Sequence, residues 1–381
     1  MNAPQALVEP FYAVEINRLA NERARHGLPV IHMEVGQPAA GAPRAAIEAG
    51  HQALRDTAQG YWESGALKER IAVHYHERHR LALEPSQIIL SMGASGALLL
   101  AIAVLFGRGA RVALARPGYP AHRNVLRALG LEPLELDCGP ETRFQPTAGM
   151  VGALDPPPAG LILTSPSNPT GTMLDAPELA ALAAICRARE IQIISDETYH
   201  GITFGRHAHS MLEFEPGAIV INSFSKYWCM TGWRLGWAVA PVGLVDAMSR
   251  YSANLFLAPP TLAQHVALAA MDERGELEAH VATYATNRRL LMGSLPGLGI
   301  TRMAPADGAF YIYADVSQLT SDSLRWCREL LDATGVALNT GRDFDAIDGG
   351  RFVRISFAVS TPEVRTALEL LAAWLGNRGA A

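Results

Sequence analysis

Five short polar segments, each following an apolar run, carry side chains that could do chemistry together. They hold a glycine-rich turn, an aromatic ring, an amide, a carboxylate and an amine, and they are Met92–Ser95, Arg116–Pro120, Thr164–Gly171, Ser195–Tyr199 and Ser223–Lys226. A lysine amine can form an imine with an aldehyde when burial lowers its pKa enough for the free base to exist near neutral pH. These segments form one candidate site if the fold brings them together.

The apolar runs before these segments are typical of β-strands. Several are nearly continuous, as expected for parallel strands that are covered on both faces. The predicted strands are Gln87–Ser91, Arg111–Ala115, Pro133–Asp137, Gly160–Ser165, Ile191–Asp196, Ala218–Ser223 and Gly236–Ala240. Because ligands bind beyond the carboxyl ends of strands in an open parallel sheet, we expect the polar segments to meet at one edge.

Helical patterns alternate with these strands and predict an α/β fold, with a mostly parallel seven-stranded sheet covered by helices on both faces. The clearest helix is Ala176–Glu190, with Asp175 as its N-cap and Pro177 in its first turn. A smaller α+β domain is predicted from the terminal parts of the chain. Its expected helices and strands are Tyr12–His26, Val281–Leu295, Phe310–Asp315, Ser323–Thr334, Phe352–Phe357 and Pro362–Leu375.

The length of 381 residues favours two domains. We assign residues 41–280 to the large domain, and residues 1–40 and 281–381 to the small one. The formal net charge of -5 gives no reason to expect nucleic acid or an anionic membrane as partner. No signal peptide is visible, and the apolar stretch Gly96–Gly107 is too short to span a bilayer, so a buried helix is expected.

The cysteines predict a reducing compartment. Cys138, Cys186, Cys229 and Cys327 are widely spaced, and none belongs to a C-x-x-C pair. This spacing argues against a disulfide framework or a zinc site and favours the cytoplasm. The histidines give no metal signal either, because His74, His76 and His79 lack the spacing of four that places ligand pairs on one face of a helix. His207 and His209 are interpreted as loop histidines, and we expect no metal.

The segment Ser-Phe-Ser-Lys (Ser223–Lys226), followed by Met-Thr-Gly-Trp-Arg-Leu-Gly (Met230–Gly236), carries a family resemblance. It resembles the fold-type I pyridoxal-phosphate aminotransferases of class I/II, closest in style to the bacterial aspartate-aminotransferase-like group. The resemblance runs from Ile31–Pro38 to Arg354–Phe357 and so covers nearly the whole chain. It implies an enzyme that binds pyridoxal 5'-phosphate in its large domain and moves an amino group from an L-amino acid to a 2-oxo acid by a ping-pong Schiff-base mechanism.

The resemblance also implies roles for the residues nearest the reacting atoms. Lys226 would form the Schiff base and then carry a proton between the substrate Cα and the cofactor. Asp196 would face the pyridine nitrogen and keep the ring protonated, so that the ring accepts electrons. Tyr199 and Asn168 would donate hydrogen bonds to the ring phenolate oxygen. Tyr119 would lie against the ring face.

Phosphate and carboxylate groups need donors and positive charge. The turn at Gly93, Ala94 and Ser95 offers backbone N–H groups at a helix start. Hydroxyls and a guanidinium would complete the phosphate site, from Ser223, Ser225 and Arg234. Arg354 would clamp the substrate α-carboxylate with its planar fork, next to Gly36 and with Tyr119 and Asn168 nearby. Arg351 lies three positions away and should point to the opposite face of the strand.

Tyr61 resembles the family tyrosine that reaches the phosphate of the neighbouring subunit, which implies a homodimer with shared active sites. Two departures from the family affect specificity. Ser95 replaces a lysine that often binds the acidic side chain of aspartate, although Arg116 or Arg123 could supply a cation instead. Ala39-Ala40-Gly41 replaces an acidic-aromatic pair. These departures favour a neutral or aromatic amino donor over aspartate.

Two other readings stay open. The same residues would serve another pyridoxal-phosphate reaction, such as a C–S β-lyase, a decarboxylase or an aminocyclopropane-forming enzyme, because fold and cofactor do not fix the reaction. The chain could also resemble the aminotransferase-like domains with which some bacterial regulators sense effectors. In those regulators a DNA-binding module precedes the aminotransferase-like domain. In this sequence no basic helix-turn-helix precedes the segment that resembles the family.

Overall fold

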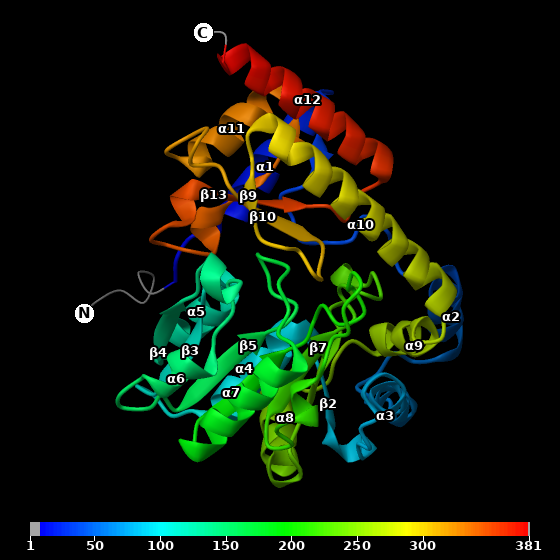
Figure 1. Cartoon of the computed structure of the whole chain (residues 1–381). Coiled ribbons are helices and arrows are strands. Elements are labelled where there is room, and N and C mark those ends of the chain that lie inside the picture. Colours follow the sequence, from blue (N-terminus) through cyan, green and yellow to red (C-terminus); the bar gives the residue numbers. More distant parts are fainter. Residues whose placement is uncertain (1–7, 380–381) are drawn as a thin grey trace, which may run out of the picture.

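A computed structural model describes residues 8–379 of the chain, and Figure 1 shows a larger sheet below a smaller one. The larger sheet has seven strands in the order β2-β8-β7-β6-β5-β3-β4, and β8 runs in the direction opposite to the other six. Its strands are β2 (Ile88–Ser91), β3 (Arg111–Arg116), β4 (Glu132–Asp137), β5 (Gly160–Thr164), β6 (Gln192–Asp196), β7 (Ile219–Ser223) and β8 (Gly236–Val239). All seven predicted strands are confirmed to within one residue at each end.

Helices cover both faces of this sheet, as predicted. On β5, Leu161 and Leu163 belong to one layer of the core, and Ile162 belongs to the other. The first layer includes α3 (Gly65–His79), α6 (Ala148–Gly152) and α7 (Ala176–Ala188), and the second includes α4 (Gly93–Leu105), α5 (Pro120–Ala128) and α8 (Val245–Leu255). Burial on both faces explains why these strands are continuous apolar runs.

Two helices confirm particular predictions. At the start of α7, the Asp175 side chain accepts a hydrogen bond from the Glu178 backbone N–H, and the Glu178 side chain accepts one from the Asp175 backbone N–H. This capping box fixes the N-terminus where the sequence placed it. Helix α4 contains most of the apolar stretch Gly96–Gly107 and is buried against the sheet. Among the described residues, no helix is both long and apolar enough to cross a membrane.

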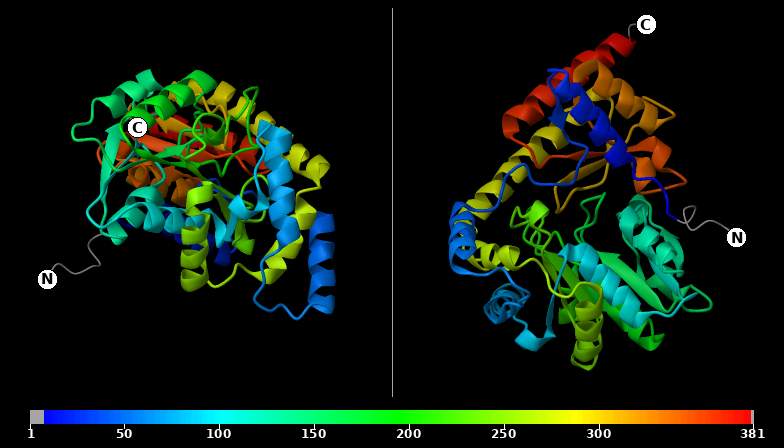
Figure 2. Two further views of the ribbon diagram at one scale, coloured as in Figure 1. Left: turned by 90° about the horizontal axis from the view of Figure 1, so that it is seen from below. Right: turned by 180° about the vertical axis from the view of Figure 1, so that it is seen from behind.

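The smaller sheet has the order β12-β13-β10-β9, and β1 pairs with β11 in a separate parallel ribbon. Seen from behind in Figure 2, the blue α1 lies among the orange and red C-terminal elements. The elements of this part are α1 (Tyr12–Arg25), β1 (Ile31–His32), β9 (Arg302–Met303), β10 (Tyr311–Asp315), α11 (Ser323–Thr334), β11 (Val336–Ala337), β12 (Asn339–Thr340), β13 (Phe352–Ser356) and α12 (Thr361–Gly379).

A long helix, α10 (Arg274–Ser294), joins the two parts, with α2 (Arg44–Asp56) and α9 (Thr261–Ala270) near its first turns (Figure 1). Helix α10 begins before the predicted Val281. Gly275 and the charged residues around it obscure the helical pattern in the sequence, but the buried Leu277 packs this first part of the helix into the core. The predicted domain boundary at residue 281 therefore falls within α10. The division at residues 41 and 281 stays a prediction, and its residues 1–7 and 380–381 lie outside the described part.

Candidate active site

A cavity of about 390 Å³ lies where the carboxyl ends of the parallel strands face the smaller sheet. From the larger sheet it is lined by Thr164, Asp196 and Ser223, which stand at the ends of β5, β6 and β7. The smaller sheet contributes Tyr311 of β10 and Arg354 of β13. The strand ends therefore meet in one place, as the sequence predicts.

Lys226 follows β7 and reaches into this cavity. Its Nζ donates a hydrogen bond to the carbonyl oxygen of Gly36 at 2.5 Å. Burial, together with the positive charges of Arg354 and Arg234, lowers the pKa of Lys226 to about 8. A substantial fraction of this amine is therefore neutral and nucleophilic near physiological pH.

Asp196 is the last residue of β6, and its buried carboxylate has partners on both oxygens. One oxygen lies 3.0 Å from His122 Nε2, and the other accepts from the backbone N–H of Thr198 at 3.1 Å and from its hydroxyl at 2.6 Å. Burial alone would raise the pKa of Asp196, but the hydrogen bond and charge of His122, followed by the bonds from Thr198, hold it below its usual value. The site thus contains a buried, ionised carboxylate.

His122 and Thr198 were not predicted as site residues. His122 lies in the first turn of α5, which begins directly after Tyr119 and lines the cavity. The ring of Tyr119 stands edge-on to the His122 ring, with centroids 5.4 Å apart. The sequence signal for His122 is a polar residue in the first turn of a helix that follows a strand.

Two tyrosines meet across the cavity, and one of them was also not predicted. The hydroxyls of Tyr199 and Tyr311 lie 2.6 Å apart. Burial, and then the neighbouring Tyr311, raise the pKa of Tyr199 well above its usual value, so its hydroxyl stays protonated. A Cβ atom at Gly36 would overlap the Tyr311 hydroxyl. Glycine is therefore required at position 36 for the backbone to approach this pair.

Arg354 is buried in the middle of β13, as the clamp prediction needs. Its Nη1 donates to Asn168 Oδ1 at 2.9 Å, and its Nη2 donates to the carbonyl oxygen of Glu34 at 2.6 Å. Its guanidinium carbon lies 4.5 Å from the ring centroid of Tyr311. The buried Nε has no hydrogen-bond partner among the described residues. The guanidinium of Arg354 is therefore held at the cavity wall, and its Nε–H remains available as a hydrogen-bond donor.

Arg351 does not line the cavity, as predicted, but it lies before the strand and not on the strand's opposite face. It stands just before β13, where its guanidinium pairs with Asp315 at 3.0 Å. Tyr61, by contrast, is 85% exposed and does not line the cavity of its own chain. Its proposed contact with a neighbouring subunit stays a prediction.

Arg116 and Arg123 do not line the cavity either. Arg116 forms ion pairs with Asp137 and Asp345. Arg123 forms ion pairs with Glu9 and Glu135.

The opposite end of the cavity is rich in donors. Ala94 and Ser95 line it at the first turn of α4, where backbone N–H groups are free to bind an anion. Ser223 and Ser225 also line it, and their hydroxyls lie 2.8 Å apart. These donors come together because the N-terminus of α4 lies beside the end of β7.

Arg234 adds a positive charge at this end and lines the cavity. Its Nη1 donates to the carbonyl oxygen of Thr231 at 3.0 Å. Gly93 does not line the cavity itself, but a Cβ atom there would lie only 2.8 Å from Arg234 Nη2, and its φ of +71° favours glycine. The glycine therefore permits the close approach of the guanidinium to the start of α4.

The sequence matches the family of class I and II aminotransferases over residues 29–371. The chain belongs to this family. It is 44% identical to the valine–pyruvate aminotransferase of Mycobacterium tuberculosis, with 99% of each chain covered. It is also 30% identical to the aspartate/prephenate aminotransferase of Thermus thermophilus, with 97% of each covered.

Solved structures agree with this assignment. An aminotransferase from Mycobacterium tuberculosis superposes with a TM-score of 0.96 at 43% identity, covering 99% of both chains. The aspartate aminotransferase of Thermus thermophilus with maleate gives a TM-score of 0.91 at 28% identity, covering 98% of this chain and 99% of that one. The protein is therefore a fold-type I, pyridoxal-phosphate-dependent aminotransferase, a family whose substrates are amino acids and oxo acids, and the α/β fold is confirmed.

The cavity of this aminotransferase fits its cofactor. Pyridoxal phosphate needs an amine for its aldehyde, an acid for its pyridine nitrogen and an anion site for its phosphate. The cavity offers the partly neutral amine of Lys226, the ionised carboxylate of Asp196 and the donors around Arg234. Because Gly93 has no side chain, the Arg234 guanidinium can lie against the start of α4, which adds its positive charge to the backbone N–H donors of that helix end.

Proposed function

We propose that this aminotransferase moves the amino group of a neutral, apolar L-amino acid to a 2-oxo acid in two half-reactions at one cavity. Bound pyridoxal phosphate supplies an aldehyde and an electron-withdrawing ring. Lys226 would hold the cofactor through its amine, which the lowered pKa supports. Once the substrate has displaced it, the same amine would move the proton at the substrate Cα.

Asp196 would hold the cofactor's ring nitrogen in its protonated form. The bonds from His122 and Thr198 keep this carboxylate charged, which is the form that the role requires. Tyr199 and Asn168 would donate to the ring oxygen, and Tyr119 would pack against the ring. The protonated hydroxyl of Tyr199 supports this role, because a donor is needed there.

The two ends of the cavity would bind the two anionic groups. The phosphate would lie at the start of α4, held by Ala94, Ser95, Ser223, Ser225 and Arg234, with Gly93 giving the backbone room. Arg354 would bind the substrate carboxylate beside Gly36. Charge-assisted bonds of this kind contribute roughly 1.5–3 kcal/mol each, enough to fix the orientation of a small substrate.

The preference for a neutral amino donor is inferred from the charged residues that line the cavity. Among the described residues, its lysines and arginines are Lys226, Arg234 and Arg354, and each already has a role. The part of the chain that the structure describes therefore offers no further lysine or arginine at the cavity for the side-chain carboxylate of aspartate, and Ser95 stands where the family often has a lysine. The cavity wall includes apolar side chains instead, among them Val14, Val35, Ala121 and Val125. The valine–pyruvate activity named for the 44% identical relative points the same way.

A half-reaction experiment tests this proposal. Purified yellow holoenzyme is mixed with one amino acid at a time, without an oxo acid, and its visible absorption band is followed. We expect valine to remove the band quickly and aspartate to leave it nearly unchanged. Bleaching by the donor alone also supports the ping-pong order. Faster bleaching by aspartate would contradict the neutral-donor proposal, and release of ammonia with an unchanged band would indicate a lyase.

We also propose a cytoplasmic homodimer with shared active sites. Tyr61 is highly exposed, and its neighbour Trp62 is 39% exposed, which supports a contact surface at this loop. The family tyrosine at this place reaches the neighbouring subunit, and Tyr61 would do so here. All four cysteines are buried and free, which supports a reducing compartment.

A further inference from the structure

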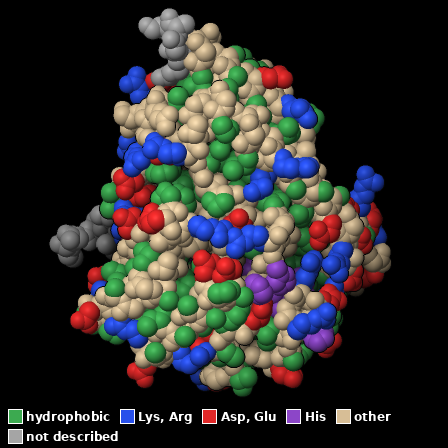
Figure 3. All heavy atoms as spheres, viewed as in Figure 1, with side chains coloured by type: hydrophobic (Ala, Val, Ile, Leu, Met, Phe, Trp, Pro, Cys, Tyr) green, Lys and Arg blue, Asp and Glu red, His purple; other side chains and the backbone are tan. Residues whose placement is uncertain are grey.

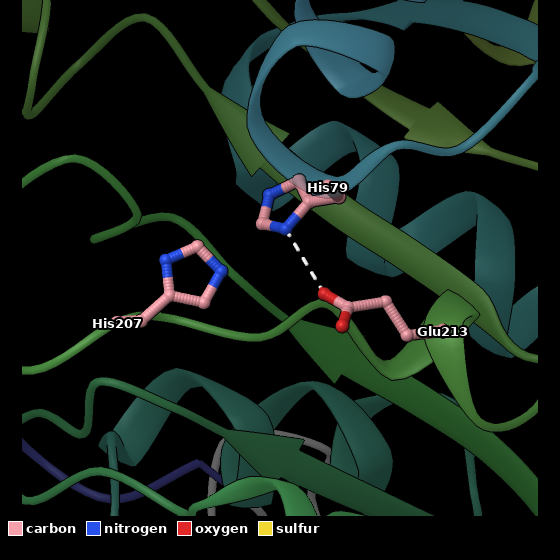
Figure 4. Close-up of side chains that lie close together, drawn as sticks. All are labelled: His79, His207 and Glu213. Atoms are coloured by element: carbon pink, nitrogen blue, oxygen red, sulfur yellow. Dashed lines mark hydrogen bonds and ion pairs between the residues drawn. The ribbon is translucent and has the colours of Figure 1, made fainter.

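A cluster of two histidines and one glutamate, residue types that can act as metal ligands, lies outside the active-site cavity. His79, His207 and Glu213 each present a donor atom, and these atoms all lie within 4.8 Å of one another. Figure 4 shows the three side chains directed toward a common point. His79 Nδ1 is already 3.1 Å from one oxygen of Glu213. None of the three lines the cavity.

The three residues come from segments that are far apart in the sequence. His79 ends α3, His207 belongs to the loop after β6, and Glu213 closes the short helix η4 (Met211–Glu213). The side chain of His79 is only 5% exposed and that of Glu213 is 21% exposed, whereas His207 is an exposed residue. The cluster therefore has a buried floor and an open side from which an ion can enter.

A fourth donor is close by. His209 Nδ1 lies 2.9 Å from the other oxygen of Glu213, and the His207 and His209 rings have centroids 4.6 Å apart. Figure 3 shows a purple group of histidine side chains on the front face of the molecule, with further purple atoms apart from it at the lower right. Two or three imidazoles with one carboxylate form a donor set that suits Zn²⁺ and its first-row neighbours better than Mg²⁺ or Ca²⁺.

We propose that His79, His207 and Glu213 bind one divalent transition-metal ion of the zinc class, with His209 or water as the fourth ligand. Bonds of about 2.0–2.2 Å to a central ion place tetrahedral donors roughly 3.3 Å apart. The pair His79–Glu213 already meets this spacing at 3.1 Å. The His207 side chain must move closer to the other two ligands to bind the same ion, and its exposed position leaves room for this movement.

Such an ion would cross-link the C-terminal end of α3 to the loop that follows the active-site strand β6. This loop is already attached to the site's neighbour Glu197, whose buried carboxylate accepts from the Ser210 hydroxyl at 3.1 Å and from the Met211 backbone N–H at 2.8 Å. The ion would thus stabilise the fold beside Asp196 without entering the cavity. We expect a role in stability, with no direct part in transamination.

Calorimetric titration of tag-free, metal-free holoenzyme with zinc chloride tests the proposal. We expect one ion per chain and a higher Tm in the presence of zinc, since an ion that binds the folded state stabilises it. His207→Ala should weaken zinc binding by more than about tenfold, because loss of even a supporting partner of a ligand costs roughly 10–100-fold. Activity without added zinc should not change in this variant.

His76→Ala is the matched control, because His76 is an exposed histidine on the same helix and lies outside the cluster. It should bind zinc like the unaltered protein. Glu213→Gln provides a second removal of a ligand, although Glu213 also closes the capping box of η4 and the variant could unfold. In that case His207→Ala decides alone. Absence of stoichiometric binding, or equal affinity of the His207→Ala and His76→Ala variants, would overturn the proposal.

Discussion

His122 Nε2 lies 3.0 Å from a carboxylate oxygen of Asp196, and both side chains are buried at the cavity. Because this contact lowers the pKa of Asp196, the His122→Phe variant should raise that pKa. The carboxylate would then become protonated at a higher pH as the pH falls, so the acidic limb of the activity profile should move to higher pH. Loss of one charge-assisted bond of about 1.5–3 kcal/mol predicts a roughly ten- to hundredfold lower kcat/KM.

His122→Gln is the control for this prediction, because an amide can still donate to the carboxylate. It should restore much of the activity and return the acidic limb toward its original position. A merely structural role for His122 would lower activity without moving that limb. An unchanged pH profile in His122→Phe would show that Asp196 does not depend on this contact.

Arg354→Lys should raise the KM for both the amino donor and the oxo acid. Lysine keeps the positive charge but lacks the planar fork that matches a carboxylate. Loss of one charge-assisted bond of about 1.5–3 kcal/mol predicts a roughly ten- to hundredfold increase in KM. Arg351→Lys is the matched control, since Arg351 pairs with Asp315 away from the cavity. Steady-state kinetics of the pair measure the effect, and equal KM values would remove Arg354 as the clamp.

The capture of pyridoxal phosphate by the apoenzyme should depend on the ionisation of Lys226. Burial lowers the pKa of this amine from 10.5 to about 8, and the neutral amine is the nucleophile. The capture rate should therefore rise from about pH 6, reach half of its maximum near pH 8 and level off above about pH 9. Stopped-flow absorbance at a series of pH values measures it. A rate that keeps rising to about pH 10 would mean that the lysine is not perturbed.

Tyr61 should act in the neighbouring subunit. Light scattering should give a dimer, and Tyr61→Phe should weaken cofactor binding because one hydroxyl donor to the phosphate is lost. A net hydrogen bond of about 0.5–1.5 kcal/mol corresponds to a roughly two- to tenfold weaker affinity. Equilibrium dialysis of cofactor against the apoenzyme measures this change. An enzyme that is fully active as a monomer would exclude the shared site.

The strands were predictable because each is a local pattern. The runs around Leu161–Leu163 and Ile219–Ile221 are apolar on both faces, and that alone indicates covered parallel strands. The edge rule for parallel sheets then placed Asp196 and Lys226 together before any contact was known. The N-terminus of α7 was predictable for the same reason, since its capping box lies within four consecutive residues.

The contacts that tune the site were not predictable, because they join distant parts of the chain. Asp196 and His122 are 74 positions apart, and Tyr199 and Tyr311 are 112 apart. The pair His79–Glu213 is 134 positions apart, so helical spacing within α3 could not reveal it. Side chains that meet only through tertiary structure leave no periodic signal in a single sequence.

The central claim is that the Lys226 amine holds the cofactor and moves the proton at the substrate Cα. The direct test is the visible spectrum of purified Lys226→Ala after addition of excess pyridoxal phosphate and removal of the unbound portion. We expect no covalent attachment after borohydride reduction and no measurable transamination, with the dimer and the Tm nearly unchanged. A Lys226→Ala protein that still attaches the cofactor covalently and transaminates would contradict the claim.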